Sequence, residues 1–133
     1  MADVTGVVHH INLSVSDLDR SESWYRELFG LTELARMTAE DGAWSKVILR
    51  HSSGLLVGLT QHERNDAKQF EEWRCGTDHV ALAVADVEAL QQWSARLDQL
   101  GVEHSPVKST PIGSLITIRD PDNIQLELYA PNP

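Results

Sequence analysis

One motif occurs twice in this chain, and the two copies lie 69 residues apart. Residues 10–17 read HINLSVSD and residues 79–86 read HVALAVAD, so both follow the pattern His-(Ile/Val)-x-Leu-x-Val-x-Asp. An offset of about half the 133-residue chain predicts two similar modules stacked in sequence. The same offset aligns Glu127 with Gly58. The repeat keeps both histidines but only one carboxylate, which favours two half-sites that assemble into a single metal site.

Each copy of the motif leads into a helical pattern. Apolar and aromatic residues recur at helical spacing through residues 16–31 and again through 87–100, and the two patterns end at Gly30 and Gly101. Asp17 and Asp86 stand where a carboxylate can accept from the free N–H groups of the first turn. The second helix is expected to be two residues longer than the first.

Strands are predicted after each helix, which gives each module the order β-α-β-β-β. The strong strands are 45–50 with 55–60, and 114–119 with 124–129, separated by the turn residues Ser-Ser-Gly and Pro-Asp-Asn. Weaker strands are expected at 32–38 and 102–109. We therefore expect a single α+β domain of two modules, 7–61 and 76–131. Residues 62–75 would join them as a polar linker or a short helix, because Phe70 and Trp73 have helix-like spacing.

Composition excludes several kinds of partner. The formal charge is −9 and the pI is near 5.0, which disfavours nucleic acid and anionic membrane surfaces. Cys75 is the single cysteine, so no intrachain disulfide can form, as suits a reducing compartment. No signal-peptide pattern and no run of about 20 apolar residues is present. We expect a soluble, cytoplasmic protein that takes a small molecule as its ligand.

Strand alternation places three possible metal ligands away from the helices. Ile11, Leu13 and Val15 would pack on the helix, which leaves His10 on the opposite face, and the same reasoning places His79 and Glu127. Two imidazoles and a carboxylate suit a divalent Fe, Mn, Ni, Co or Zn ion and leave coordination positions open.

Simpler interpretations of these residues exist. A lone strand histidine is more often a hydrogen-bonded or partly exposed residue, and Glu127 alone is typical of a solvated strand. The repeat favours the metal site, since histidine recurs at one equivalent position. The other histidines lack such an equivalent, and His9 is expected on the face opposite His10: they are His9, His51, His62 and His104.

The chain resembles the vicinal oxygen chelate superfamily from Val8 to about Ala130. The resemblance rests on residues 10–18 with Ser21 and Trp24-Tyr25, on the strand after His79, and on residues 120–128, DPDNIQLEL. This group includes glyoxalase I, extradiol dioxygenases, fosfomycin-resistance transferases, methylmalonyl-CoA epimerase and bleomycin-binding proteins. It implies the glyoxalase/bleomycin-resistance/dioxygenase fold, in which paired β-α-β-β-β modules form an incomplete barrel around a cleft.

The resemblance also implies roles for particular positions. Metal ligands in such proteins come from the first and last strands of the modules, which here are His10, position 58, His79 and Glu127. Glyoxalase I-like members carry a carboxylate or amide where this chain has Gly58, so glyoxalase and epimerase chemistry is disfavoured. Tyr129 is a candidate to hydrogen-bond a metal-bound oxygen, or it is pocket wall. The substrate-binding residues expected on the cleft face are Asn12, Lys46, Ile48, Leu56, Gly58, Ala81, Thr117 and Tyr129.

Two kinds of function remain open. The first is a divalent-metal-dependent dioxygenase, lyase or transferase acting on a small oxygen-chelating substrate. The alternative is a resistance protein that sequesters an antibiotic or another planar metabolite without turnover, with Trp44, Trp73 or Tyr129 stacking on it. Lys46, Arg50 and Arg119 share the cleft-side phase, yet no potassium loop of the fosfomycin type is evident. Small members of the group often form homodimers, either side by side or with exchanged modules.

Overall fold

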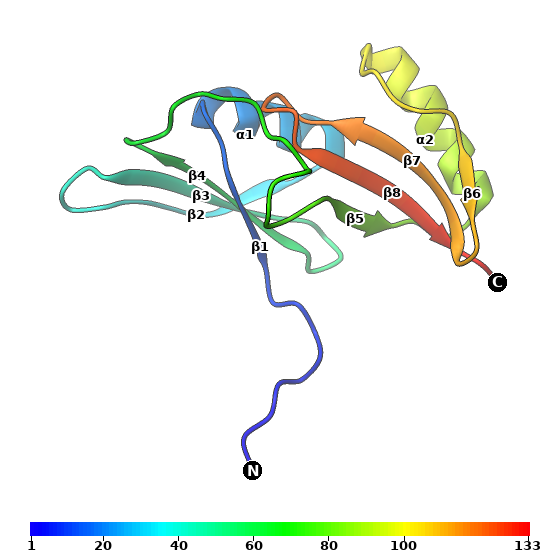
Figure 1. Ribbon diagram of the computed structural model, residues 1–133, viewed down its shortest axis with the longest axis horizontal. Helices are drawn as coiled ribbons and strands as arrows, with labels where there is room; N and C mark the ends of the chain where they lie inside the picture. Colours follow the sequence, from blue (N-terminus) through cyan, green and yellow to red (C-terminus); the bar gives the residue numbers. More distant parts are fainter. The chain divides into compact units, whose positions relative to one another are not determined.

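The computed structural model describes residues 1–133 and divides into two compact units, Met1–Lys68 and Gln69–Pro133. Each unit has the predicted order β-α-β-β-β (Figure 1). The elements of the first unit are β1 (Ile11–Ser14), α1 (Leu18–Phe29), β2 (Thr32–Thr38), β3 (Trp44–Arg50) and β4 (Leu56–His62). Those of the second are β5 (Val80–Ala83), α2 (Val87–Leu100), β6 (Lys108–Thr110), β7 (Gly113–Arg119) and β8 (Gln125–Pro131).

Each unit contains one open, mixed, four-stranded sheet. The strand order is β1-β4-β3-β2 in the first unit and β5-β8-β7-β6 in the second. The first strand pairs in parallel with the last, and the other neighbours are antiparallel. The parallel pairs place Asn12 beside Gly58 and Ala81 beside Glu127. The sequence repeat is therefore a structural repeat with the same register in both sheets, as predicted.

Both helices begin and end as the sequence predicts. Asp17 caps α1 by accepting from the Arg20 N–H at 3.0 Å, and Asp86 caps α2 by accepting from the Ala89 N–H at 2.8 Å. Gly30 and Gly101 follow the helices with φ of 66° and 68°. This left-handed conformation suits glycine, which has no Cβ to oppose it.

The core of each unit lies between the sheet and its helix. α1 packs on β3 and β4, and α2 packs on β7 and β8. The side chains that face the helices are fully or almost fully buried, among them Val47, Leu49, Ile116 and Ile118. Burying a side chain of this size contributes roughly 1.5–3 kcal/mol. The opposite face of each sheet carries no helix of its own unit, and it holds Glu127 and the predicted substrate-binding residues of the strands.

One sequence expectation differs from the structure. The strand expected at 102–109 is limited to Lys108–Thr110, with an isolated bridge from His104 to Ile118. Pro106 has no N–H to donate, and the Ser105 hydroxyl takes the Thr117 N–H at 2.9 Å, so a regular ladder cannot continue there.

The segment between β4 and β5 forms turns and irregular backbone rather than a helix. Asn65 and Asp66 each accept a hydrogen bond from the backbone N–H two residues later, on Ala67 and Lys68. Such local bonds stabilise turns and compete with helix formation.

No helix of the structure is long and apolar enough to cross a membrane.

Candidate metal and substrate site

A buried carboxylate and an imidazole meet in the second unit. Glu127 lies in the middle of β8 and is only 8 % exposed. His79 directly precedes β5, and its Nε2 lies 3.5 Å from Glu127 Oε2. The parallel register explains the contact, because Val80 pairs with Leu126 and Ala81 with Glu127. Two of the three predicted metal ligands are therefore neighbours.

The other nitrogen of His79 is also occupied. Its Nδ1 lies 2.7 Å from Oδ1 of Asp78. A carboxylate at Nδ1 favours the neutral tautomer with the proton on Nδ1, which leaves the Nε2 lone pair free on the side of Glu127. A nitrogen lone pair and a carboxylate side by side suit a divalent transition ion.

His10, the third predicted ligand, belongs to the first unit. It is exposed, directly precedes β1, and its Nδ1 lies 2.9 Å from Nδ1 of His9. No group of three or more His, Cys, Asp or Glu side chains that could hold a metal lies together in the structure. The complete trio thus stays a prediction. The contact between the two rings also corrects the expectation that His9 points away from His10, since strand alternation applies only from Ile11 onward.

Gly58 does not leave open space. A Cβ built at Gly58 would lie 2.6 Å from Nδ2 of Asn12, so the Asn12 amide covers the position that a side chain would take. The Asn12 Oδ1 accepts a hydrogen bond of 2.8 Å from the Thr60 hydroxyl. That bond fixes the amide and leaves the Nδ2 hydrogens available to an oxygen acceptor. The space beside Gly58 is therefore filled by Asn12.

The helix-free face of β3 and β4 carries the other predicted substrate residues of the first unit. Lys46, Ile48 and Leu56 alternate with the buried Val47, Leu49 and Val57, so they point away from α1. The Lys46 Nζ lies 5.0 Å from the centre of the Trp44 ring. A cation over an indole keeps its hydrogen-bond donors available to a ligand.

Glu127 has small neighbours in its own sheet. Ala81 pairs with it on one side and Thr117 on the other. Tyr129, two residues further along β8, has its hydroxyl 2.6 Å from the Thr110 hydroxyl, and its ring covers the backbone of Gly113. The Tyr129 hydroxyl is therefore tied to the turn between β6 and β7, which favours its role as a wall of the site.

Arg119 is already engaged by a carboxylate that sequence reasoning missed. Its guanidinium donates to both oxygens of Glu72, at 3.0 and 2.9 Å. These hydrogen bonds lower the pKa of Glu72 to about 2 and, with a weaker contribution from the charge of Asp78, raise the pKa of Arg119. Asp78 and Glu72 lie in the irregular segment, where no periodicity signals a role. The only sequence signal for Asp78 is its position directly before His79.

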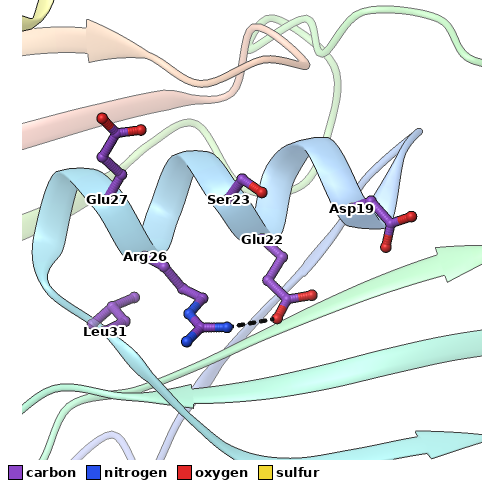
Figure 2. A pocket seen from close by; sticks show the side chains of 6 residues that line it. All are labelled: Asp19, Glu22, Ser23, Arg26, Glu27 and Leu31. Carbon is purple, nitrogen blue, oxygen red and sulfur yellow. Dashed lines mark hydrogen bonds and ion pairs between the residues drawn. The ribbon is translucent and has the colours of Figure 1, made fainter.

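A separate hollow of ≈ 650 Å³ lies along α1 and is lined by Asp19, Glu22, Ser23, Arg26, Glu27 and Leu31 (Figure 2). Its buried carboxylate, Glu22, accepts from Arg36 at 2.6 Å and from Arg26 at 3.3 Å. These bonds, the one from Arg36 foremost, lower the pKa of Glu22. The hollow contains none of the predicted site residues, and Glu22 and Arg26 in its lining form an ion pair with each other.

Known proteins resemble the chain over nearly its whole length. The chain is 31% identical to glutathione transferase FosA of Serratia marcescens, over 92% of its own length and 79% of that protein. It is 30% identical to lactoylglutathione lyase GLX1 of Arabidopsis thaliana, of which it spans 44%. A domain from Frankia sp., described as glyoxylase/bleomycin resistance protein/dioxygenase, is 31% identical with a TM-score of 0.86, covering 98% of this chain and 100% of that one.

A fosfomycin resistance protein, FosX from Listeria monocytogenes, shares the fold. Its variant solved with Mn(II) and 1S,2S-dihydroxypropylphosphonic acid is 22% identical, with a TM-score of 0.72 over 97% of this chain and 95% of that one. The model of the glyoxalase/bleomycin resistance protein/dioxygenase superfamily matches residues 7–128. Together with the repeated β-α-β-β-β units and the matching register of their sheets, this match shows that the chain belongs to that superfamily.

Proposed function

We propose that this chain is a divalent-metal-dependent enzyme acting on a small oxygen-chelating substrate, with His10, His79 and Glu127 as the metal ligands. The observation that carries the proposal is the buried Glu127 carboxylate facing Nε2 of His79 at 3.5 Å. A buried carboxylate is costly without a cationic or hydrogen-bonding partner. A divalent ion between these two groups would satisfy both.

We further propose substrate-binding roles for residues of each unit. When bound, a divalent ion supplies a Lewis acid that polarises a substrate oxygen. The Asn12 amide would donate a hydrogen bond to a second oxygen, and the Lys46 ammonium would attract an anionic group. Ala81 and Thr117 leave room beside Glu127, and Tyr129 forms a wall.

Among dioxygenase, lyase and transferase, the first unit argues against a glyoxalase-type lyase. That chemistry looks to a side chain at position 58 for proton transfer, and here Gly58 has none and lies beneath the Asn12 amide. The 31% identity to glutathione transferase FosA supports the transferase class.

The alternative is sequestration of a planar ligand without turnover. The half-buried Trp44, with Lys46 over its ring, supports this function because an indole and an ammonium bind an aromatic anion well. A ligand that quenches tryptophan fluorescence and is recovered unchanged would favour it over catalysis.

Metal content tests the enzyme proposal. Protein purified without chelator is analysed by mass spectrometry for bound transition metals, as wild type, as His79→Ala and as His62→Ala, which removes an exposed strand histidine outside the proposed site. We expect close to one ion per intact site in wild type and His62→Ala, and a loss of about 10-fold or more in affinity in His79→Ala. Equal metal content in all three proteins would overturn the proposal.

A further inference from the structure

The segment that leads into β5 is fastened to the turn between β7 and β8. The Phe70 N–H donates to the Asp122 carbonyl at 2.8 Å, and the Asn123 side chain donates to the Phe70 carbonyl at 3.0 Å. Two residues later, Glu72 accepts both bonds from Arg119. These hydrogen bonds thus hold the beginning of the segment between Phe70 and β5 in place.

Arg119 makes a further hydrogen bond at this turn. Besides its two bonds to Glu72, its Nη1 donates to the Asn123 carbonyl at 3.1 Å, so the guanidinium is held at the end of β7. Asp78 is close enough for its charge to act on Arg119 and raise the pKa of the guanidinium.

Asp78 contacts His79, one of the proposed metal ligands. Its Oδ1 accepts from Nδ1 of His79 at 2.7 Å, while Nε2 of the same ring faces Glu127. Each ring nitrogen of His79 therefore has a carboxylate beside it, and the two carboxylates have different roles. Glu127 is 11 % exposed in its side chain and would bind metal, whereas Asp78 is 63 % exposed and lies behind the ring.

We propose that Asp78 is a positioning residue that fixes the tautomer and orientation of His79. This inference rests on the proposed function of His79 as a ligand. A carboxylate behind a ligating imidazole fixes the ring and makes its free nitrogen a better donor, and loss of such a partner typically costs 10–100-fold in metal affinity. Because Asp78 is mostly exposed, solvent screening places the expected loss near the lower end, about 10-fold.

The first test requires no metal. In metal-free protein at about pH 8, where histidine is mostly neutral, long-range ¹H–¹⁵N spectra report which nitrogen of His79 carries the proton. We expect the Nδ1–H tautomer in wild type and a shift toward Nε2–H, the usual preference of a free imidazole, in Asp78→Ala. Glu71→Ala is the matched control, since it removes a carboxylate from the same segment that pairs with Arg74 instead. An unchanged tautomer in Asp78→Ala would overturn the inference.

The second test is titration of the metal-free proteins with Mn(II), followed by electron paramagnetic resonance. We expect affinity to fall about 10-fold in Asp78→Ala and by less in Asp78→Asn, which keeps an acceptor oxygen but loses the charge, with Glu71→Ala equal to wild type. If Asp78→Ala does not fold, Asp78→Asn carries the test, and affinity equal to wild type in it overturns the inference. Absence of Mn(II) binding in wild type would instead overturn the proposed function, while the tautomer result still decides the role of Asp78.

Discussion

Asn12 and Gly58 constrain each other across the β1–β4 pair. The amide of Asn12 lies where a side chain at position 58 would stand, and it is held there by Thr60. In the equivalent pair of the second unit the small residue, Ala81, lies on the first strand and the larger one, Glu127, lies on the last. In each sheet the two facing positions hold one functional side chain, an amide in the first unit and a carboxylate in the second.

This arrangement predicts strong coupling between positions 12 and 58. Gly58→Ala would push the Asn12 amide off Thr60 and cost about 1 kcal/mol of unfolding free energy, the value of one hydrogen bond. In an Asn12→Ala background the added methyl has space, and its cost is expected to vanish. Urea denaturation of the four proteins in a double-mutant cycle measures the coupling. Strictly additive effects would contradict the contact.

Each unit ties its helix to the segment that follows it with an ion pair. In the first unit Glu22 of α1 accepts from Arg36 of β2 at 2.6 Å. In the second, Nε2 of His104 lies 2.7 Å from Oδ1 of Asp98 in α2, and its Nδ1 lies 2.7 Å from the Ser105 carbonyl. Both nitrogens of His104 face acceptors, so the protonated ring satisfies both and its pKa is raised above 6.5, chiefly by Asp98. Only this second pair titrates near neutral pH.

The His104 pair predicts a pH-dependent contribution to stability. A raised pKa in the folded state means that the contribution is fully present below the ordinary value of 6.5 and is lost as pH rises through the higher folded value. Wild type should therefore exceed His104→Gln in unfolding free energy by more at about pH 5.5 than at about pH 9. The difference should stay below about 1 kcal/mol, because Asp98 is 72 % exposed.

Urea denaturation at the two pH values measures this contribution. His51→Gln is the control, because the ring of that histidine hydrogen-bonds to Ser53 and not to a carboxylate. A difference between wild type and His104→Gln that is the same at both pH values would contradict the prediction.

Secondary structure was predictable where local chemistry decides it. The capping aspartates, the glycines after the helices and the alternation of the strong strands are local signals, and those elements were confirmed. The strand before β7 was overestimated because Pro106 and Ser105 interrupt its ladder. Asp78 was missed as well, since a residue outside a strand has no face that periodicity could assign.

The molecule consists of two units, and each contains at least one of the proposed metal ligands. The second unit brings His79 and Glu127 together by strand register alone. His10 stands at the same register position of the first unit. The alternation of residues along a strand assigns these faces within one unit. It carries no information about which units come together in an assembly.

We propose that the chain forms a homodimer, and mixing variants distinguishes the two possible assemblies. If modules are exchanged, a dimer of one His10→Ala chain and one His79→Ala chain contains one intact and one doubly altered site. Random re-association of equal amounts would then restore about one site in four. If each site belongs to one chain, every site in the mixture stays defective.

Metal binding of the mixed and unmixed variants, with sedimentation to establish the dimer, measures the restoration. Dimers that show no restoration would assign the site to a single chain. A monomer in solution would contradict the homodimer itself.

The contact between Asn12 and Gly58 also bears on how such a chain can diverge. Acquiring a fourth ligand at position 58 requires a carboxylate there and a small residue at position 12. A carboxylate introduced first would collide with the Asn12 amide, and alanine introduced first at position 12 would remove a donor from the proposed substrate site. Each single substitution is therefore disadvantageous, so a fourth ligand at position 58 is not easily gained or lost one substitution at a time. The equivalent pair of the second unit, Ala81 and Glu127, already combines a small residue with a carboxylate.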